Sequence, residues 1–280
     1  MLSFSKVALL FLGVSLSACA GVKTETSSAA APSLSSDYFT GLKGCFLLYN
    51  MKTGAFDKVI GEEVCKERFP ACSTFKVPLA VMAFDSGVLK DENVVYKWDG
   101  KSGMRPEEKR DQNAKTWMRD SVVWFSQRLT PQLGAKRVQK YLDGFEYGNR
   151  DMSAGLTQAW LVSPSKNAGL KISAYEQVEF MKKLWTDSLP VSKRAMKLTR
   201  EITYLETSPK GFVLNGKTGS GFYDSDRKLN FGWFIAHLQK GDQEYIAVAN
   251  LSDLKPSEEG YGGPRAKAVV KRVFGDLGLW

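Results

Sequence analysis

Residues 69–84 read FPACSTFKVPLAVMAF, and this stretch decides how the chain of 280 residues is interpreted. From Ser73 onwards, apolar residues recur at helical spacing. Pro78 fits only near the start of such a helix, where its missing N–H costs little. The pattern therefore predicts a helix that begins near Ser73 and places Lys76 one turn later on the same face.

A hydroxyl and an amine side by side at a helix N-terminus are a candidate nucleophile and base. The Ser-x-x-Lys tetrad has little specificity, because it occurs five times, starting at Ser3, Ser73, Ser163, Ser225 and Ser252. The pair Ser73 and Lys76 differs from the others because its helix is strongly apolar and is expected to be buried. Apolar surroundings lower the pKa of a lysine amine, and a shift of about three units corresponds to about 4 kcal/mol.

The composition is that of a globular protein, with 43% hydrophobic and 25% charged residues. The formal net charge is +9, but the basic residues are spread along the chain and no nucleic-acid motif is present. We therefore expect a basic solvated surface and no nucleic-acid partner. The single histidine, His237, lies in an apparent strand, which argues against a Ser-His-Asp triad and against most zinc sites, so no metal is expected.

The amino terminus predicts export. Residues 1–18 have the shape of a signal peptide, with Lys6 before a short apolar run. The tetrad Leu-Ser-Ala-Cys ending at Cys19 resembles a bacterial lipobox, while Ala18-x-Ala20 is a competing site of ordinary cleavage. We expect a periplasmic protein anchored to the membrane only through a lipid on Cys19. Residues 19–36 are rich in Ser, Thr and Ala and are expected to form a flexible tether.

Export makes disulfide bonds possible. The chain has four cysteines, and three remain if Cys19 carries the lipid. Cys45 and Cys65 flank a predicted hairpin and could meet. Cys72 would then stay free, next to Ser73.

Strand-like segments lie at both ends of the chain and helix-like segments lie in the middle. This order predicts an α/β fold of the α+β type over residues 37–280, in which one antiparallel sheet is built from both chain ends and flanked by helices, with a mainly helical region over about 88–186. The expected strands cover residues 44–50, 55–60, 229–238 and 244–251. The expected helices after the first cover residues 114–128, 131–142, 174–186, 191–207 and 265–274.

Several motifs follow one another in an order that resembles the class D β-lactamases, or oxacillinases, of the serine β-lactamase and penicillin-binding protein superfamily. They are Ser73-x-x-Lys76, Ser121-Val122-Val123, Tyr147-Gly148-Asn149, Trp160 and Lys217-Thr218-Gly219. The resemblance runs from about Gly44 to the carboxyl terminus. Ser220, directly after the Lys-Thr-Gly, is a departure that concerns the shape of the pocket floor.

The resemblance implies hydrolysis of β-lactam antibiotics through an acyl-enzyme on Ser73. It also implies that Lys76 is carboxylated by carbon dioxide or bicarbonate, with no other cofactor, and serves as general base for acylation and deacylation. The N–H of Trp160 would donate to the carbamate, because a buried indole needs an acceptor. Val123 and Leu161 are expected to form the wall of the lysine pocket.

The remaining roles implied by the resemblance concern the substrate. Ser121 would pass a proton to the departing ring nitrogen. Lys217, Thr218 and Arg265 would hold the substrate carboxylate. The backbone N–H groups of Ser73 and Ser220 would form the oxyanion hole.

Two other functions use the same residues. A β-lactam sensor or penicillin-binding module would be acylated at Ser73 without turnover. A cell-wall peptidase or transpeptidase would also share the serine, the lysine and the Lys-Thr-Gly, but an Asn would suit it better at position 123, where this chain has Val123.

Overall fold

A computed structural model describes residues 36–223 and 227–280. The expected signal peptide, Cys19 and all but the last residue of the expected tether lie outside the described residues. Within the described part of the chain, no helix combines the length and the apolar character that a membrane span requires.

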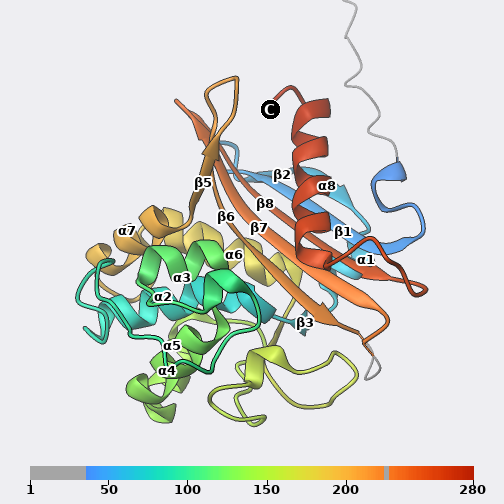
Figure 1. The fold of residues 1–280 in the computed structure, drawn as a ribbon. Coiled ribbons are helices and arrows are strands. Elements are labelled where there is room, and N and C mark those ends of the chain that lie inside the picture. The colour runs from blue at the N-terminus through green and yellow to red at the C-terminus, as the bar shows by residue number, and fades with distance from the viewer. Residues whose placement is uncertain (1–35, 224–226) are drawn as a thin grey trace, which may run out of the picture. The chain divides into compact units, whose positions relative to one another are not determined.

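A six-stranded antiparallel sheet organises the fold, in the order β2-β1-β8-β7-β6-β5 (Figure 1). The strands are β1 (Leu42–Asn50), β2 (Ala55–Ile60), β5 (Tyr204–Thr207), β6 (Val213–Phe222), β7 (Asn230–Lys240) and β8 (Gln243–Asp253). β1 pairs with β8 along its whole length, so the sheet is built from both chain ends, as predicted. A second, two-stranded sheet joins β3 (Phe69–Pro70) to β4 (Lys171–Ile172).

The helices cover both faces of the sheet. One face carries α8 (Gly262–Asp276), and the other faces the helical region (Figure 1). The other helices are α1 (Glu62–Lys66), α2 (Lys76–Asp85), α3 (Ala114–Asp120), α4 (Val123–Leu133), α5 (Ala135–Phe145), α6 (Ala174–Trp185) and α7 (Lys193–Ile202), with 3₁₀ turns η1 (Ser36–Phe39), η2 (Cys72–Phe75), η3 (Pro106–Glu108) and η4 (Ala159–Leu161).

Two apolar cores follow from this layering. Along β7, Trp233 and Ile235 belong to the core under the helical region, whereas Phe234 and Leu238 belong to the core under α8. Alternate side chains of a strand point to opposite faces, and both faces of β7 are covered. The strand is therefore apolar almost throughout.

Three expected helices were wrong in their bounds. The helix expected over residues 114–128 is two helices, because Ser121 adopts a left-handed conformation with φ 57° between α3 and α4. The next helix begins at Ala135 rather than Pro131, after Gly134 has ended α4. The helix expected over residues 191–207 ends at Ile202, because residues 204–207 pair with β6 as strand β5.

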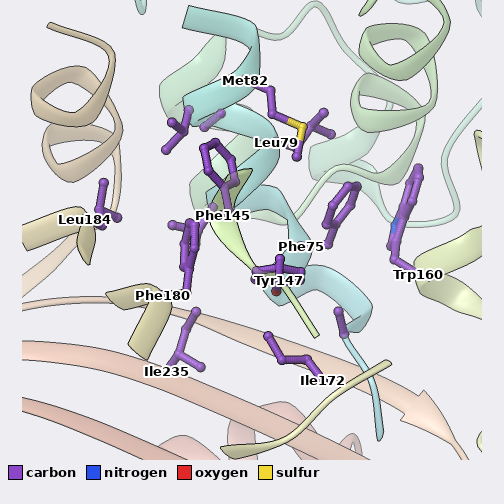
Figure 2. Packing of buried hydrophobic residues seen from close by; sticks show 14 of the residues in the cluster. Phe75, Leu79, Met82, Phe145, Tyr147, Trp160, Ile172, Phe180, Leu184 and Ile235 are labelled. Atoms are coloured by element: carbon purple, nitrogen blue, oxygen red, sulfur yellow. The ribbon is translucent and has the colours of Figure 1, made fainter. Parts of the chain in front are cut away.

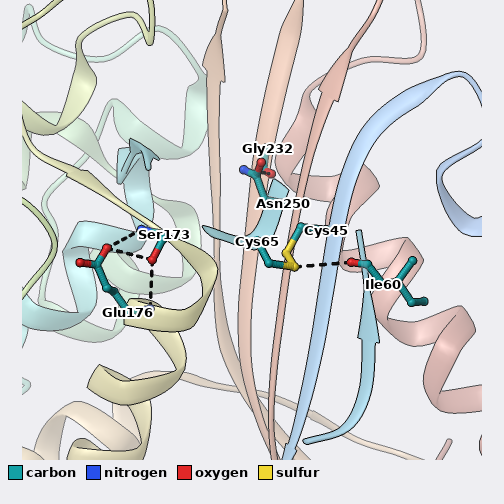
Figure 3. The surroundings of a disulfide bond; sticks show 7 residues. All are labelled: Cys45, Ile60, Cys65, Ser173, Glu176, Gly232 and Asn250. Atoms are coloured by element: carbon teal, nitrogen blue, oxygen red, sulfur yellow. Dashed lines mark hydrogen bonds between the residues drawn. A yellow bond between two sulfur atoms is a disulfide. The ribbon is translucent and has the colours of Figure 1, made fainter. Parts of the chain in front are cut away.

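The cysteine assignment is confirmed. Cys45 of β1 and Cys65 of α1 form a disulfide bond (Figure 3). The same view shows the Ser173–Glu176 capping box that begins α6. Cys72 is free and buried. Burial raises the pKa of the Cys72 thiol to about 12, which keeps it protonated beside Ser73.

Candidate active site

Ser73 and Lys76 lie at the start of the central helix and are in contact. Ser73 belongs to the turn η2, and Lys76 is the first residue of α2, with Pro78 two residues further on. The Lys76 Nζ lies 3.1 Å from the Ser73 Oγ. The Lys76 side chain is only 1% exposed, whereas Ser73 is partly exposed. A substrate can thus reach the hydroxyl while the amine stays dry.

The electrostatic surroundings favour a neutral amine at Lys76. Burial is the largest cause that holds the pKa of Lys76 well below its usual range, and the charge of Lys217 acts in the same direction. Arg105 lowers this pKa further, while Glu108 raises it. A neutral lysine can accept a proton from a neighbouring hydroxyl.

Strand β6 packs closely against the turn that carries Ser73. A Cβ atom added at Gly219 would lie 3.2 Å from Cγ2 of Thr74 and 3.3 Å from the carbonyl oxygen of Ala71. The indole N–H of Trp233 donates to the carbonyl of Pro70 at 2.9 Å. The glycine and this hydrogen bond allow the Lys-Thr-Gly segment to lie alongside the candidate nucleophile.

Lys217 is a buried cation on β6. It is 4% exposed, and its ammonium donates to the carbonyl of Thr218 at 3.0 Å. No acidic side chain of the described residues forms an ion pair with it. Burial, followed by the charge of Arg105, lowers the pKa of Lys217 to about 7. A cavity of about 170 Å³ beside Lys217 and Thr218 has Arg119 and Lys267 in its lining.

Ser121 occupies the corner between α3 and α4. Its φ of 57° and ψ of 38° are left-handed, a conformation that costs a non-glycine residue about 1–2 kcal/mol. Val122 is fully buried, whereas Val123 starts α4 and is only partly buried. That Val123 forms part of the wall of the lysine pocket stays a prediction.

Trp160 lies in η4, close to the start of α2. Its ring is fully buried and stacks on Phe75, the residue before Lys76, with 5.0 Å between the ring centroids (Figure 2). Its Nε1–H has no hydrogen-bond partner among the described residues. Leu161, which was expected in the wall of the lysine pocket, is 38% exposed, because the single turn η4 buries the indole and leaves the next side chain partly in solvent.

Arg265 and Ser220 meet at the start of α8. The Arg265 guanidinium is paired with Asp253 at 2.7 Å and with Glu259 at 2.8 Å. The Ser220 Oγ accepts a hydrogen bond from the Gly263 N–H at 2.9 Å. Arg265, which sequence reasoning assigned to the substrate carboxylate, is therefore already held by two acidic side chains.

Sequence reasoning missed Arg105 and Glu108, which lie outside every expected helix and strand. Glu108 is 7% exposed and accepts a hydrogen bond from the Arg105 Nε at 3.0 Å. Both charges act on the pKa of Lys76. A Pro followed by two acidic residues at 106–108 is a helix-start signal that could have marked this turn.

A serine beside a buried lysine, facing a second buried lysine on a sheet strand, defines a serine hydrolase whose base is a lysine rather than a histidine. The penicillin binding protein transpeptidase domain family matches residues 44–275. The chain belongs to this family.

Individual relatives narrow the assignment. Beta-lactamase OXA-1 from Escherichia coli is 37% identical over 240 residues, which is 83% of each chain. The structure of the class D β-lactamase BAT-2 has a TM-score of 0.78 at 30% identity and covers 90% of this chain and 99% of its own. The structure of the OXA-427 class D β-lactamase has a TM-score of 0.74 at 37% identity and covers 84% and 98%. Within the family, this chain is a class D serine β-lactamase, which confirms the identification made from its motifs.

Proposed function

We propose that the protein hydrolyses β-lactam antibiotics through an acyl-enzyme on Ser73, with carboxylated Lys76 as the general base for acylation and deacylation. The observation that carries this proposal is the 3.1 Å contact between Lys76 Nζ and Ser73 Oγ, made by a lysine that is 1% exposed. A solvated lysine would keep its proton near neutral pH and could not serve.

The residues around Lys76 fit a carbamate. A neutral, desolvated amine is the form that adds carbon dioxide, and Lys76 has these surroundings. The buried Nε1–H of Trp160 lacks an acceptor among the described residues, and a carbamate oxygen is an acceptor of the required kind. When formed, the carbamate supplies an anionic base in an otherwise apolar pocket.

The other residues bind the substrate and move protons. In acylation the Ser73 hydroxyl gives its proton to the base at Lys76 while its Oγ forms a bond to the lactam carbonyl carbon. The ring C–N bond breaks, and Ser121 delivers a proton to the departing nitrogen and regains one from the base. The backbone N–H groups of Ser73 and Ser220 stabilise the charge on the carbonyl oxygen. In deacylation a water molecule gives a proton to the base at Lys76 and attacks the ester carbonyl carbon. The bond to the Ser73 Oγ breaks, the carboxylic acid product leaves, and Ser73 regains its proton.

Lys217 and Thr218 hold the substrate carboxylate. The Lys217 ammonium is buried and unpaired with any acid of the described residues, so a substrate carboxylate would supply its missing counter-charge. Arg265 takes part only by exchanging Asp253 or Glu259 for the substrate. We therefore assign the first contact to Lys217.

The test is hydrolysis of nitrocefin with and without added bicarbonate. We expect turnover that bicarbonate stimulates, and its loss in Ser73→Ala. Ser86→Ala, at the opposite end of α2, is the matched control and should hydrolyse at the wild-type rate. An inert wild-type protein with bicarbonate present would contradict the proposal.

The two alternative functions give different results in the same experiments. A sensor or binding module would show an adduct on Ser73 that persists for hours, detected by mass spectrometry of the intact protein. A cell-wall enzyme would cleave a D-alanyl-D-alanine peptide at a useful rate.

We further propose that the protein is exported to the periplasm and anchored by a lipid on Cys19. The support is the apolar amino-terminal run followed by Leu-Ser-Ala-Cys. Mass spectrometry of the mature amino terminus tests this proposal: a diacylglyceryl mass on Cys19 is expected, and a plain amino terminus at Gly21 would show ordinary cleavage after Ala20.

A further inference from the structure

One arginine links the turn η3 to the corner at Ser121. The Arg105 Nη2 donates to Oε1 of Glu108 at 2.7 Å and also to the backbone carbonyl of Asp120. The Arg105 Nη1 lies 3.3 Å from the carboxylate of Glu107. The guanidinium is thus fixed on two sides within its own turn and reaches across to α3.

We propose that Arg105 is a positioning residue for Ser121: its guanidinium joins the Glu108 carboxylate to the carbonyl of Asp120 and so fixes the peptide that leads into Ser121. This inference rests on the proton-transfer role that the proposed function gives to Ser121.

Peptide geometry explains why this contact matters. The carbonyl of Asp120 and the N–H of Ser121 belong to one planar peptide unit, so a bond to the carbonyl fixes the orientation of the whole unit. Ser121 is a non-glycine residue in the left-handed region, which persists only where the surroundings impose it. A strong donor on the preceding carbonyl is such a restraint.

The other end of the clamp is anchored as well. Glu108 is almost fully buried, and its Oε2 accepts a hydrogen bond from the Met104 N–H at 2.8 Å. The indole N–H of Trp124, one residue into α4, donates to the Glu108 carbonyl at 2.8 Å. The Glu108 carboxylate is therefore fixed in place and holds the Arg105 guanidinium near the corner. Hydrogen bonds connect both α3 and α4 to η3.

The effect of Arg105 on neighbouring pKa values agrees with a position of its guanidinium near the active site. The charge of Arg105 lowers the pKa of both Lys76 and Lys217, so the guanidinium is close enough to act on the two lysines of the site. The donors of Arg105 are themselves engaged by protein acceptors.

The test separates binding from chemistry. Single-turnover kinetics with nitrocefin give the dissociation constant of the non-covalent complex and the acylation rate constant. We expect Arg105→Gln to slow acylation about 10- to 100-fold, as misplacement of a reacting group does, while the dissociation constant changes less than about threefold. Arg105→Lys keeps the charge but offers one nitrogen for two acceptors, so it should restore only part of the rate.

Arg110 provides the matched control. It pairs with the same residue, but through the side-chain carboxylate of Asp120 at 2.8 Å rather than through the peptide carbonyl. Arg110→Gln should acylate within about twofold of the wild-type rate. Melting temperatures of the Arg105 and Arg110 variants show whether either variant has lost its fold. If Arg105→Gln does not fold, the acylation rate of Arg105→Lys still tests the role of Arg105.

A double-mutant cycle with Ser121→Ala decides the mechanism. If Arg105 acts through Ser121, Arg105→Gln should slow acylation less than about threefold once Ser121 is already alanine. An equal loss in both backgrounds, or normal acylation by Arg105→Gln while Ser121→Ala is slow, would overturn this inference alone. Full-rate acylation by Ser121→Ala would overturn the proton-transfer role and the inference together.

Discussion

Replacing Trp160 by phenylalanine tests whether the indole N–H of this residue holds a carbamate on Lys76. The indole is fully buried, stacks on Phe75, and has an Nε1–H without an acceptor among the described residues. Phenylalanine keeps an aromatic ring against Phe75 and removes the donor. The substitution therefore separates packing from hydrogen bonding.

The expected magnitude follows from the charge of the acceptor. A hydrogen bond to a charged group contributes about 1.5–3 kcal/mol, and about 1.4 kcal/mol corresponds to a factor of ten. Trp160→Phe should therefore raise the bicarbonate concentration for half-maximal activity about 10- to 100-fold. The free energy of unfolding without bicarbonate should change little. An unpaired buried N–H destabilises the wild type by about 1–3 kcal/mol, and removing it offsets the poorer packing of the smaller ring.

Two measurements check this expectation. The first is a bicarbonate titration of nitrocefin hydrolysis. The second is the rise of the melting temperature with bicarbonate, which reports binding without turnover. Trp117→Phe is the control, because Trp117 is equally buried but donates to Ser126 at 2.9 Å, and its bicarbonate requirement should match that of the wild type. If Trp160→Phe needed no more bicarbonate than the wild type, the indole would have no part in holding the carbamate.

Three further predictions concern stability and charge. Lys217→Met should abolish carboxylate binding yet raise the melting temperature at pH 6. The pKa of Lys217 is about 7 in the folded state and 10.5 in the unfolded state, so between these values the unfolded state binds more protons and the stability of the wild type rises with pH. In thermal scans, the difference in melting temperature between variant and wild type should therefore narrow towards pH 10. Cys45→Ala with Cys65→Ala opens a link between residues 20 apart in sequence and should cost about 3 kcal/mol of unfolding free energy in urea titrations; an unchanged midpoint would exclude that contribution. Arg265→Leu leaves the buried Asp253 carboxylate with hydrogen bonds from Asn230 but without a counter-charge, and should cost about 3–5 kcal/mol of unfolding free energy, most of it recovered by adding Asp253→Asn. A stable Arg265→Leu protein that binds substrate poorly would instead restore the carboxylate role.

The local chemistry of the chain was predictable where neighbours in sequence are also neighbours in space. The apolar spacing after Ser73 and the position of Pro78 predicted the central helix, and the structure differs only in making the first turn 3₁₀. The same reasoning placed the hairpin of β1 and β2 and allowed the Cys45–Cys65 pairing. These features depend on contacts within about twenty residues.

Contacts between separate elements defeated the same reasoning elsewhere, even at short separations along the chain. Residues 204–207 continue a helix-like pattern, but pairing with β6 makes them a strand. Nothing local shows that Asp253 and Glu259 hold Arg265, or that Leu161 turns outward while Trp160 is buried. Tertiary partners outweigh the small differences in local preference.

The amino-acid sequence by itself indicated the reaction class, because the order of Ser73, Lys76, Ser121 and Lys217 along the chain resembles that of the class D β-lactamases. Only the tertiary structure decided which charges surround them. Arg105 reaches the carbonyl of Asp120 across fifteen residues, and both lysines are buried although they lie far apart in sequence. Burial and distance set the pKa of an amine, and neither is a property of the linear chain.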